Sequence, residues 1–296
     1  MKMFTITVPA SSANIGPGFD SAGMAVNRYL TLQVVKQDQW EFKHHSPFLP
    51  KETNYKNHFI YNVAKRIAKQ HDKTLPTCKV IVDSQIPLAR GLGSSASAVV
   101  AGIELANQLC NLSLSTEEKL QYATEIEGHP DNVAPALFGG FVITAASADG
   151  DVNFIKIPDL DLDIVLYIPS VELKTKEARS VLPAEFSRNE ATQASGISNL
   201  MIASLLTKDY SLAGKMMEQD LFHEPYRAKL VPNYHTIIQK ARMGGAYGTV
   251  ISGAGPTMIS FVPQGKGQEV AEEMSKLLTD YDVASLKIDL NGLQVK

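Results

Sequence analysis

The chain has 296 residues, which is enough for two domains that each bury a core of their own. Apolar residues make up 44% of it and charged residues 20%, with a net charge of −3, so it has the composition of a globular protein and no basic surface for nucleic acid. We expect no membrane partner, because polar residues interrupt the apolar runs well before the roughly 20 positions that cross a bilayer.

Two further features predict a cytoplasmic protein. The first eight residues alternate like a strand and lack the continuous apolar region of a signal peptide. Cys78 and Cys110 have neither the number nor the spacing of a disulfide framework or a zinc site, which fits a reducing compartment.

The first half of the chain mixes strands with helices. Strands are predicted at residues 4–8, 30–35 and 78–82, and an amphipathic helix at 57–71. Ser115 and Glu118 have the spacing of a capping box, so another helix should begin there and end near residue 127. An apolar strand up to residue 146, a turn at 148–151 and a strand at 153–157 then complete a first domain, residues 1–160.

The second half is richer in helices and forms a second domain, residues 161–296. It begins with a strand at 164–168. Helices are predicted at 198–206, 211–220, 234–243 and 266–278, and strands at 248–252, 258–262 and 284–290. The fold class that follows is α+β.

A glycine- and serine-rich loop carries the strongest chemical signal. Gly91 and Gly93 lie between a strand and a helical run, where they allow a tight turn and a close backbone approach to a ligand. The helix that follows presents unpaired amide groups and the positive end of its dipole, which suits phosphate oxygens. The loop lacks the Gly-Lys-Ser/Thr ending of a Walker loop and the third glycine of a Rossmann loop, and a simple turn that caps a buried helix is the alternative.

The string Pro-Leu-Ala-Arg-Gly-Leu-Gly-Ser-Ser-Ala-Ser that forms this loop resembles the nucleotide-binding signature of the GHMP kinases. This family is named after galactokinase, homoserine kinase, mevalonate kinase and phosphomevalonate kinase. The resemblance implies that ATP is the cofactor and that eleven residues contact it: Pro87, Leu88, Ala89, Arg90, Gly91, Leu92, Gly93, Ser94, Ser95, Ala96 and Ser97.

Two further strings resemble the family's other motifs, in the family's order. Residues 9–20, which contain Asn14 and Asp20, follow the first strand and resemble the amino-terminal motif of homoserine kinases. Residues 253–257, which contain Gly255, resemble the third motif, a loop near the phosphates and the substrate. Either string alone is typical of an ordinary turn.

The string from Glu127 to Gly140 resembles the homoserine kinase branch more than the mevalonate kinase or galactokinase branches. The resemblance implies phosphorylation of L-homoserine, an amino acid that needs a cationic partner for its carboxylate and an acidic one for its ammonium group. The substrate-binding residues implied are Asn14, Asp20, His129, Asn132, Arg179, Arg227 and Gly255, with Asp20 on the ammonium group and the two arginines on the carboxylate.

The catalytic residues implied are few, because phosphoryl transfer depends mainly on positioning and charge neutralisation. Thr175 orients the hydroxyl, Asn132 occupies the place of the base in related kinases, and Asp131 is the nearest carboxylate if a base operates. Mg²⁺ is implied as a second cofactor, held by Ser94 and by either Glu125 or Glu127.

The same resemblance implies a two-domain GHMP kinase fold. Its amino-terminal domain has a left-handed βαβ crossover, its carboxyl-terminal domain is ferredoxin-like, and a homodimer is plausible. A kinase for another small alcohol such as mevalonate, or an inactive nucleotide-binding regulator, remains the alternative.

Overall fold

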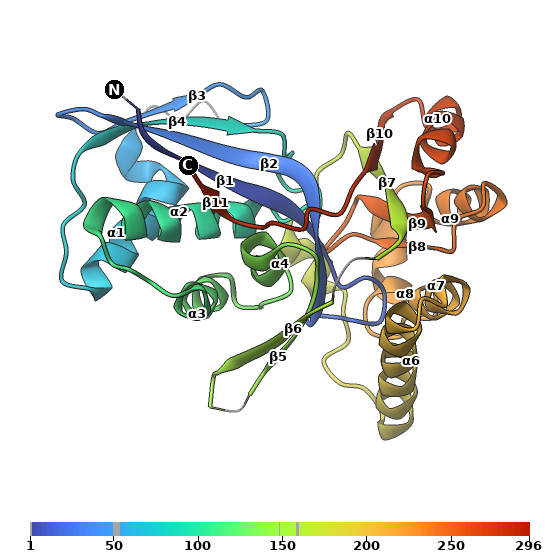
Figure 1. The fold of residues 1–296 in the computed structure, drawn as a ribbon. Helices are drawn as coiled ribbons and strands as arrows, with labels where there is room; N and C mark the ends of the chain where they lie inside the picture. The colour runs from blue at the N-terminus through green and yellow to red at the C-terminus, as the bar shows by residue number, and fades with distance from the viewer. Residues whose placement is uncertain (1, 50–53, 148, 158–159) are drawn as a thin grey trace.

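The computed structural model describes residues 2–49, 54–147, 149–157 and 160–296, which fold around two sheets (Figure 1). The first sheet has seven strands: β1 (Lys2–Ala13), β2 (Ala22–Lys36), β3 (Glu41–His44), β4 (Cys78–Ser84), β5 (Phe141–Ala146), β6 (Val152–Ile157) and β11 (Gln294–Val295). The second has four: β7 (Leu162–Pro169), β8 (Gly248–Ile251), β9 (Met258–Pro263) and β10 (Tyr281–Leu286).

The first sheet runs in the order β11-β1-β2-β4-β3, and β5 and β6 extend it from the other end of β2. All of its pairs are antiparallel except β3 with β4, which are parallel and joined by α1 (Phe59–Gln70). These three elements form the βαβ unit of the domain; the hand of its crossover stays a prediction.

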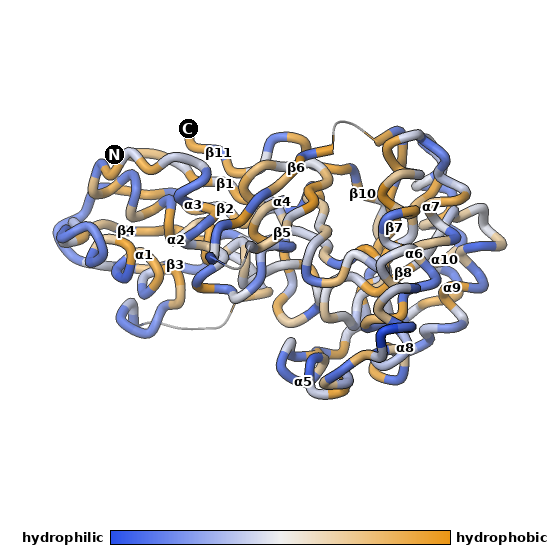
Figure 2. Tube along the Cα trace, turned by 90° about the horizontal axis from the view of Figure 1, so that it is seen from below, coloured by the Kyte–Doolittle hydropathy of each residue, from blue (hydrophilic) through white to orange (hydrophobic). Residues whose placement is uncertain are grey.

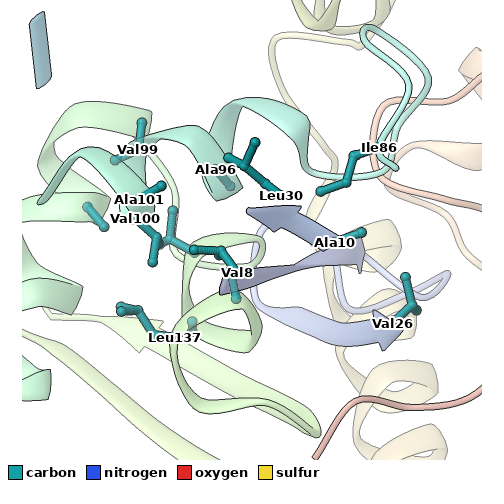
Figure 3. Close-up of a cluster of buried hydrophobic side chains, with 14 of the residues drawn as sticks. Val8, Ala10, Val26, Leu30, Ile86, Ala96, Val99, Val100, Ala101 and Leu137 are labelled. Atoms are coloured by element: carbon teal, nitrogen blue, oxygen red, sulfur yellow. The ribbon is translucent and has the colours of Figure 1, made fainter. Parts of the chain in front are cut away.

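Helices cover one face of this sheet (Figure 1). α2 (Ser94–Cys110) and α4 (Val133–Phe138) contact the sheet directly, and α1 and α3 (Thr116–Glu127) flank α2. α2 is buried over most of its length, and its Ala96, Val99 and Val100 belong to the same buried cluster as Val8 of β1 and Leu137 of α4 (Figure 3). This packing fixes the start of α2 beside the end of β1.

The second domain has the strand order β10-β7-β9-β8, with helices on both faces of the sheet. Numbered within the domain, that order is 4-1-3-2 with helices after the first and third strands, which is a ferredoxin-like arrangement. The remaining helices are α5 (Thr175–Ser180), α6 (Arg188–Leu206), α7 (Tyr210–Met217), α8 (Glu224–Arg227), α9 (Tyr234–Met243) and α10 (Gly267–Leu277), with short 3₁₀ turns at Tyr55–Asn57 and Ala228–Leu230.

Hydropathy follows this architecture, with apolar segments inside each domain and polar ones at its rim (Figure 2). None of the helices in the described part of the chain combines the length and the apolar character that crossing a bilayer requires.

Most of the predicted elements are present, with longer strands. β1 and β2 extend well beyond the predicted 4–8 and 30–35, and α3 begins with the predicted capping box, in which Ser115 accepts from Glu118 N and Glu118 accepts from Ser115 N. The predicted turn at 148–151 includes Ala148, which lies outside the described residues, as do Pro158 and Asp159 beside the predicted domain boundary.

The strand predicted at 284–290 is wrong in its position, because β10 ends at Leu286. Beyond it, Asp289 N donates to Ala25 O at 3.0 Å, and Gln294 and Val295 pair with β1. The end of the chain therefore returns to the first sheet, while the division between 160 and 161 stays a prediction.

Candidate active site

Three loops meet at the junction of the two domains. Gly253 N donates to Ala13 O at 3.0 Å, which joins the loop after β8 to the end of β1. Ser252 Oγ donates to Gly91 O at 2.7 Å and lies 2.8 Å from Ser12 Oγ, which adds the loop before α2. The three motifs that lie far apart in the sequence therefore form one site.

The loop before α2 leaves the start of that helix open. Gly93 is the N-cap, with a φ of +65° that suits glycine, and no side chain among the described residues caps the first turn. The buried Ser97 hydroxyl donates to Pro9 O at 2.9 Å, so it anchors the helix to β1. The amides of the first turn are thus presented to a ligand with the positive end of the helix dipole.

A small polar cavity of about 80 Å³ lies in front of these amides. Its walls bring together most of the residues predicted to bind substrate or phosphate: Asn14, Asp20, Ala89, Gly91, Leu92, Gly93, Ser94, Ser95, Glu127, His129, Asp131, Asn132, Thr175, Arg179 and Arg227. Both domains therefore contribute to the cavity.

Charged groups of both signs line this cavity. Arg179 makes a two-pronged ion pair with Asp20, with N–O distances of 2.6 and 3.0 Å. Arg227 is only 1% exposed, and its guanidinium group donates to Ala178 O and Gly253 O at 3.1 Å each. An ammonium and a carboxylate group can both find partners here.

The pKa values of the two arginines are shifted in opposite directions from the ordinary value. Burial lowers the pKa of Arg227 to about 10, the charge of Arg179 acts in the same direction, and Asp20 opposes both. The hydrogen bonds that Arg179 donates to Asp20 raise the pKa of Arg179 above its ordinary value. Both guanidinium groups remain cationic at neutral pH, so both can bind an anion.

A chain of polar side chains lies beside Asp20 in the same cavity. His129 Nδ1 donates to Asp131 Oδ1 at 2.5 Å, Asn132 Nδ2 donates to the same oxygen at 3.2 Å, and Ser11 Oγ donates to Asn132 Oδ1 at 2.9 Å. Burial lowers the pKa of His129, but the hydrogen bond and charge of Asp131 outweigh it and raise the pKa overall. Asp131 thus already accepts hydrogen bonds from His129 and Asn132, and Asn132 is held in one orientation.

A second cavity, of about 560 Å³, adjoins the first and shares Ala89, Ser94, Ser95 and Thr175 with it. Its walls are mainly apolar, with a few polar groups: Leu30, His44, Leu49, Asn57, His58, Phe59, Ile60, Val82, Ser84, Ile86, Leu88, Ala98 and Lys174 complete them. The size and composition suit a planar heterocycle with an attached sugar, placed next to the helix amides.

Several residues predicted for the site lie elsewhere. Glu125 pairs with Arg66 on the surface, whereas Glu127 accepts from Ser95 Oγ at 2.9 Å and lines the small cavity. The Arg90 side chain donates to the carbonyl oxygens of Pro169 and Ser170, so it ties the loop to β7. Gly255, Pro87, Ala96 and Ser97 line neither of the two cavities.

Sequence reasoning missed other wall residues. Leu173, Gly253 and Ala254 line the small cavity, and Ser11 orients Asn132. Gly253 and Ala254 lie inside the third motif, whereas Gly255, the residue predicted from this motif, does not line the cavity. The apolar wall of the large cavity carries no motif, because any residues of suitable size can form it.

α8 carries Arg227 and is held in place by the buried Glu224. Tyr234 Oη and Ile251 N each donate to this carboxylate at 2.5 Å. Burial raises the pKa of Glu224 to about 8, although both hydrogen bonds act to lower it. The folded protein therefore binds a proton here that the unfolded chain releases above its ordinary pKa of 4.5.

We expect the free energy of unfolding to decrease as pH rises from 4.5 to about 8, by up to about 1.4 kcal/mol per pH unit from Glu224. Glu224→Gln, which carries no titrating proton, should remove that contribution and flatten the dependence between pH 5 and pH 8. Urea unfolding at several pH values measures it. Glu185→Gln, at an exposed position, should leave the slope unchanged, and a Glu224→Gln protein with the original slope would show that Glu224 titrates normally.

Comparison with known proteins shows the family of the chain. Residues 58–140 match the model of the GHMP kinases N terminal domain, and residues 201–280 match that of the GHMP kinases C terminal domain. The homoserine kinase of Oceanobacillus iheyensis is 53% identical over 100% of both chains, and that of Halalkalibacterium halodurans is 49% identical over 99% of this chain and 94% of its own.

Solved structures give the same answer. The homoserine kinase of Cytophaga hutchinsonii is 30% identical, with a TM-score of 0.84 over 99% of this chain and 97% of its own. A mevalonate kinase, at 19% identity and a TM-score of 0.72 over 96% of this chain and 99% of its own, shares the fold. With both family models matched and full-length identity near one half, the chain belongs to the GHMP kinase family, and within it to the homoserine kinases.

Proposed function

We propose that the protein transfers the γ-phosphoryl group of ATP to the side-chain hydroxyl of L-homoserine, yielding O-phospho-L-homoserine. The observation that carries this proposal is the small cavity, which is lined both by Asp20, Arg179 and Arg227 and by the loop at the open start of α2. Charges for an amino acid and donors for a triphosphate line one cavity, so acceptor and donor can meet there.

On the nucleotide side, the chain supplies backbone donors. The amides after Gly93 face the cavity at the positive end of the α2 dipole, where they bind and orient phosphate oxygens. The large apolar cavity next to Ser94 and Ser95 takes the nucleoside. The triphosphate is thereby directed from the large cavity into the small one.

On the amino-acid side, opposite charges select a zwitterion. Asp20 takes the ammonium group, and Arg179 and Arg227 take the carboxylate. Mevalonate has a carboxylate and no ammonium group, so it would place nothing cationic against Asp20. This favours an amino acid over the other acceptors of the family.

At the reacting end, the chain orients the hydroxyl. Asn132 is fixed by Ser11 and Asp131, and Thr175 lines both cavities, so both can hydrogen-bond the hydroxyl as it attacks. Asn132 takes up no proton at neutral pH, and Asp131 already accepts from His129 and Asn132. The rate enhancement therefore comes from alignment and from neutralising charge.

Magnesium fits the oxygen groups at the junction of the two cavities. Ser94 lines both cavities, and Glu127 lies beside it, hydrogen-bonded to Ser95. Hydroxyl and carboxylate oxygens are the ligands that Mg²⁺ prefers. Bound there, the ion would neutralise phosphate charge, and Ser94 and Glu127 would hold it.

Glu127→Gln should raise the Mg²⁺ concentration needed for half-maximal activity by about tenfold, because it removes a carboxylate ligand. Activity measured against free Mg²⁺ at constant ATP tests this. Glu125→Gln is the matched control, two residues away and paired with Arg66 outside the cavity, and should leave the curve in place. The reverse pattern would assign the ion to Glu125.

A panel of acceptors tests the reaction itself. Purified protein with ATP and Mg²⁺ should release ADP with L-homoserine and much less with mevalonate, D-galactose or 4-hydroxybutyrate, which has the carboxylate and hydroxyl without the amine. Turnover with mevalonate alone would reassign the acceptor. Nucleotide binding without turnover of any acceptor would identify a regulator that lacks catalysis.

A further inference from the structure

Phe19 is next to Asp20 in the amino-terminal motif and contacts both arginines that line the small cavity. Its ring faces both arginines: Arg227 Cζ lies over it at 5.4 Å from the centroid, and Arg179 Cζ at 5.7 Å. The ring of the buried His223 stacks on it at 5.4 Å with an interplanar angle of 26°. One aromatic side chain thus contacts both carboxylate-binding groups.

The backbone fixes the position of this ring. Asp20 N donates to Asn14 Oδ1 at 3.1 Å, and Ala22 N donates to Gly18 O at 2.8 Å, so Phe19 lies inside a closed turn. A Cβ at Gly18 would lie 2.4 Å from Ala22 Cβ, which shows how tightly the turn is packed. His223 Nε2 lies 3.0 Å from Gly16 O, which fixes the imidazole ring that stacks on Phe19. The ring is therefore a rigid surface.

The face of this ring can stabilise two cations that lie close to each other. Arg179 and Arg227 come from different helices, α5 and α8, and their like charges repel each other. Burial is the main cause of the lowered pKa of Arg227, and the charge of Arg179 adds to it. The negative face of an aromatic ring attracts a guanidinium group and favours its flat stacking. Phe19 offers such a partner to both groups at once, so it opposes their separation.

We propose that Phe19 is a positioning residue that sets the relative placement of Arg179 and Arg227, and thereby the affinity of the site for the substrate carboxylate. This inference rests on the proposed function, in which the two guanidinium groups bind the carboxylate of homoserine. Phe19 touches neither the phosphates nor the reacting hydroxyl in this arrangement, so its effect is on substrate binding.

Phe19→Leu tests the inference, because leucine keeps the apolar bulk and removes the aromatic face. We expect the KM for L-homoserine to rise about tenfold, while kcat and the KM for ATP change less than about twofold. Phe19→Tyr retains the face and should stay close to the unaltered protein. Phe138→Leu, which removes a ring that stacks on Phe154 and lines neither cavity, should change none of the three constants.

Melting temperatures show that each variant is folded, and Phe19→Met serves the same test if the leucine variant does not fold. An unchanged KM for homoserine, or an equal rise in both KM values, would overturn the role of Phe19. So would a Phe19→Tyr protein as impaired as Phe19→Leu, because that would point to packing alone. The unaltered protein is assayed first: its failure to turn over homoserine would overturn the proposed function, and the inference with it.

Discussion

Replacing Arg227 by leucine is expected to raise the KM for L-homoserine by about 10- to 150-fold while the KM for ATP stays within about twofold. The substitution removes one of two cations at the carboxylate position, and hydrogen bonds to charged groups contribute roughly 1.5 to 3 kcal/mol each. ATP affinity should survive, because Arg227 lines the small cavity and not the large one. Steady-state kinetics with each substrate varied in turn measures both constants.

Leucine places an apolar side chain at this almost fully buried position and removes a cation that is costly there. The loss of donors to Ala178 O and Gly253 O acts against stability, so unfolding is measured alongside. Arg242→Leu is the control, an exposed arginine paired with Glu218 outside both cavities. If Arg227→Leu kept the homoserine KM, the carboxylate would have to bind elsewhere.

Gly93→Ala should lower kcat/KM for ATP at least about 100-fold. A Cβ at this position would lie 2.0 Å from Ser11 Oγ and 3.0 Å from Asn132 Oδ1, and the φ of +65° strains any residue with a side chain. The loop has to shift, and a displacement of about 1 Å at a reacting centre is enough for a 100-fold loss. The shift would also disturb the Ser11 bond that orients Asn132.

Gly196→Ala is the matched control for this change. Gly196 lies within α6, and a Cβ there would have nothing within 4 Å. Alanine in the helix should stabilise the protein by about 0.5 to 1 kcal/mol and leave activity unchanged. If Gly93→Ala were folded and as active as Gly196→Ala, the bend before α2 would not hold the triphosphate.

Much of the fold was predictable because local signals agreed with it. The capping box of Ser115 and Glu118 set the start of α3, and the period of apolar residues set α1 and α9 nearly to their ends. Strand lengths were less predictable, because pairing between neighbours extends β1 and β2 through their polar residues. The return of Gln294 and Val295 to β1 is a contact between chain ends that no local pattern encodes.

The residues of the site were likewise predictable only where a local sequence pattern constrains them. The strings around Asn14, Gly91 and Gly253 were recognisable, because close backbone approach requires particular residues at fixed spacing. The choice between Glu125 and Glu127 was open in the sequence, since both lie on the last turn of α3 and only their directions differ. No sequence pattern indicated the role of Phe19, because its contacts come from two helices more than 150 residues away in the chain.

The most direct test is a crystal structure with a non-hydrolysable ATP analogue, Mg²⁺ and L-homoserine. The proposal predicts phosphate oxygens against the amides that follow Gly93, with the homoserine carboxylate between Arg179 and Arg227 and its hydroxyl in line with the terminal phosphate. A nucleotide bound elsewhere, with the bend at Gly91–Gly93 free of phosphate, would contradict it.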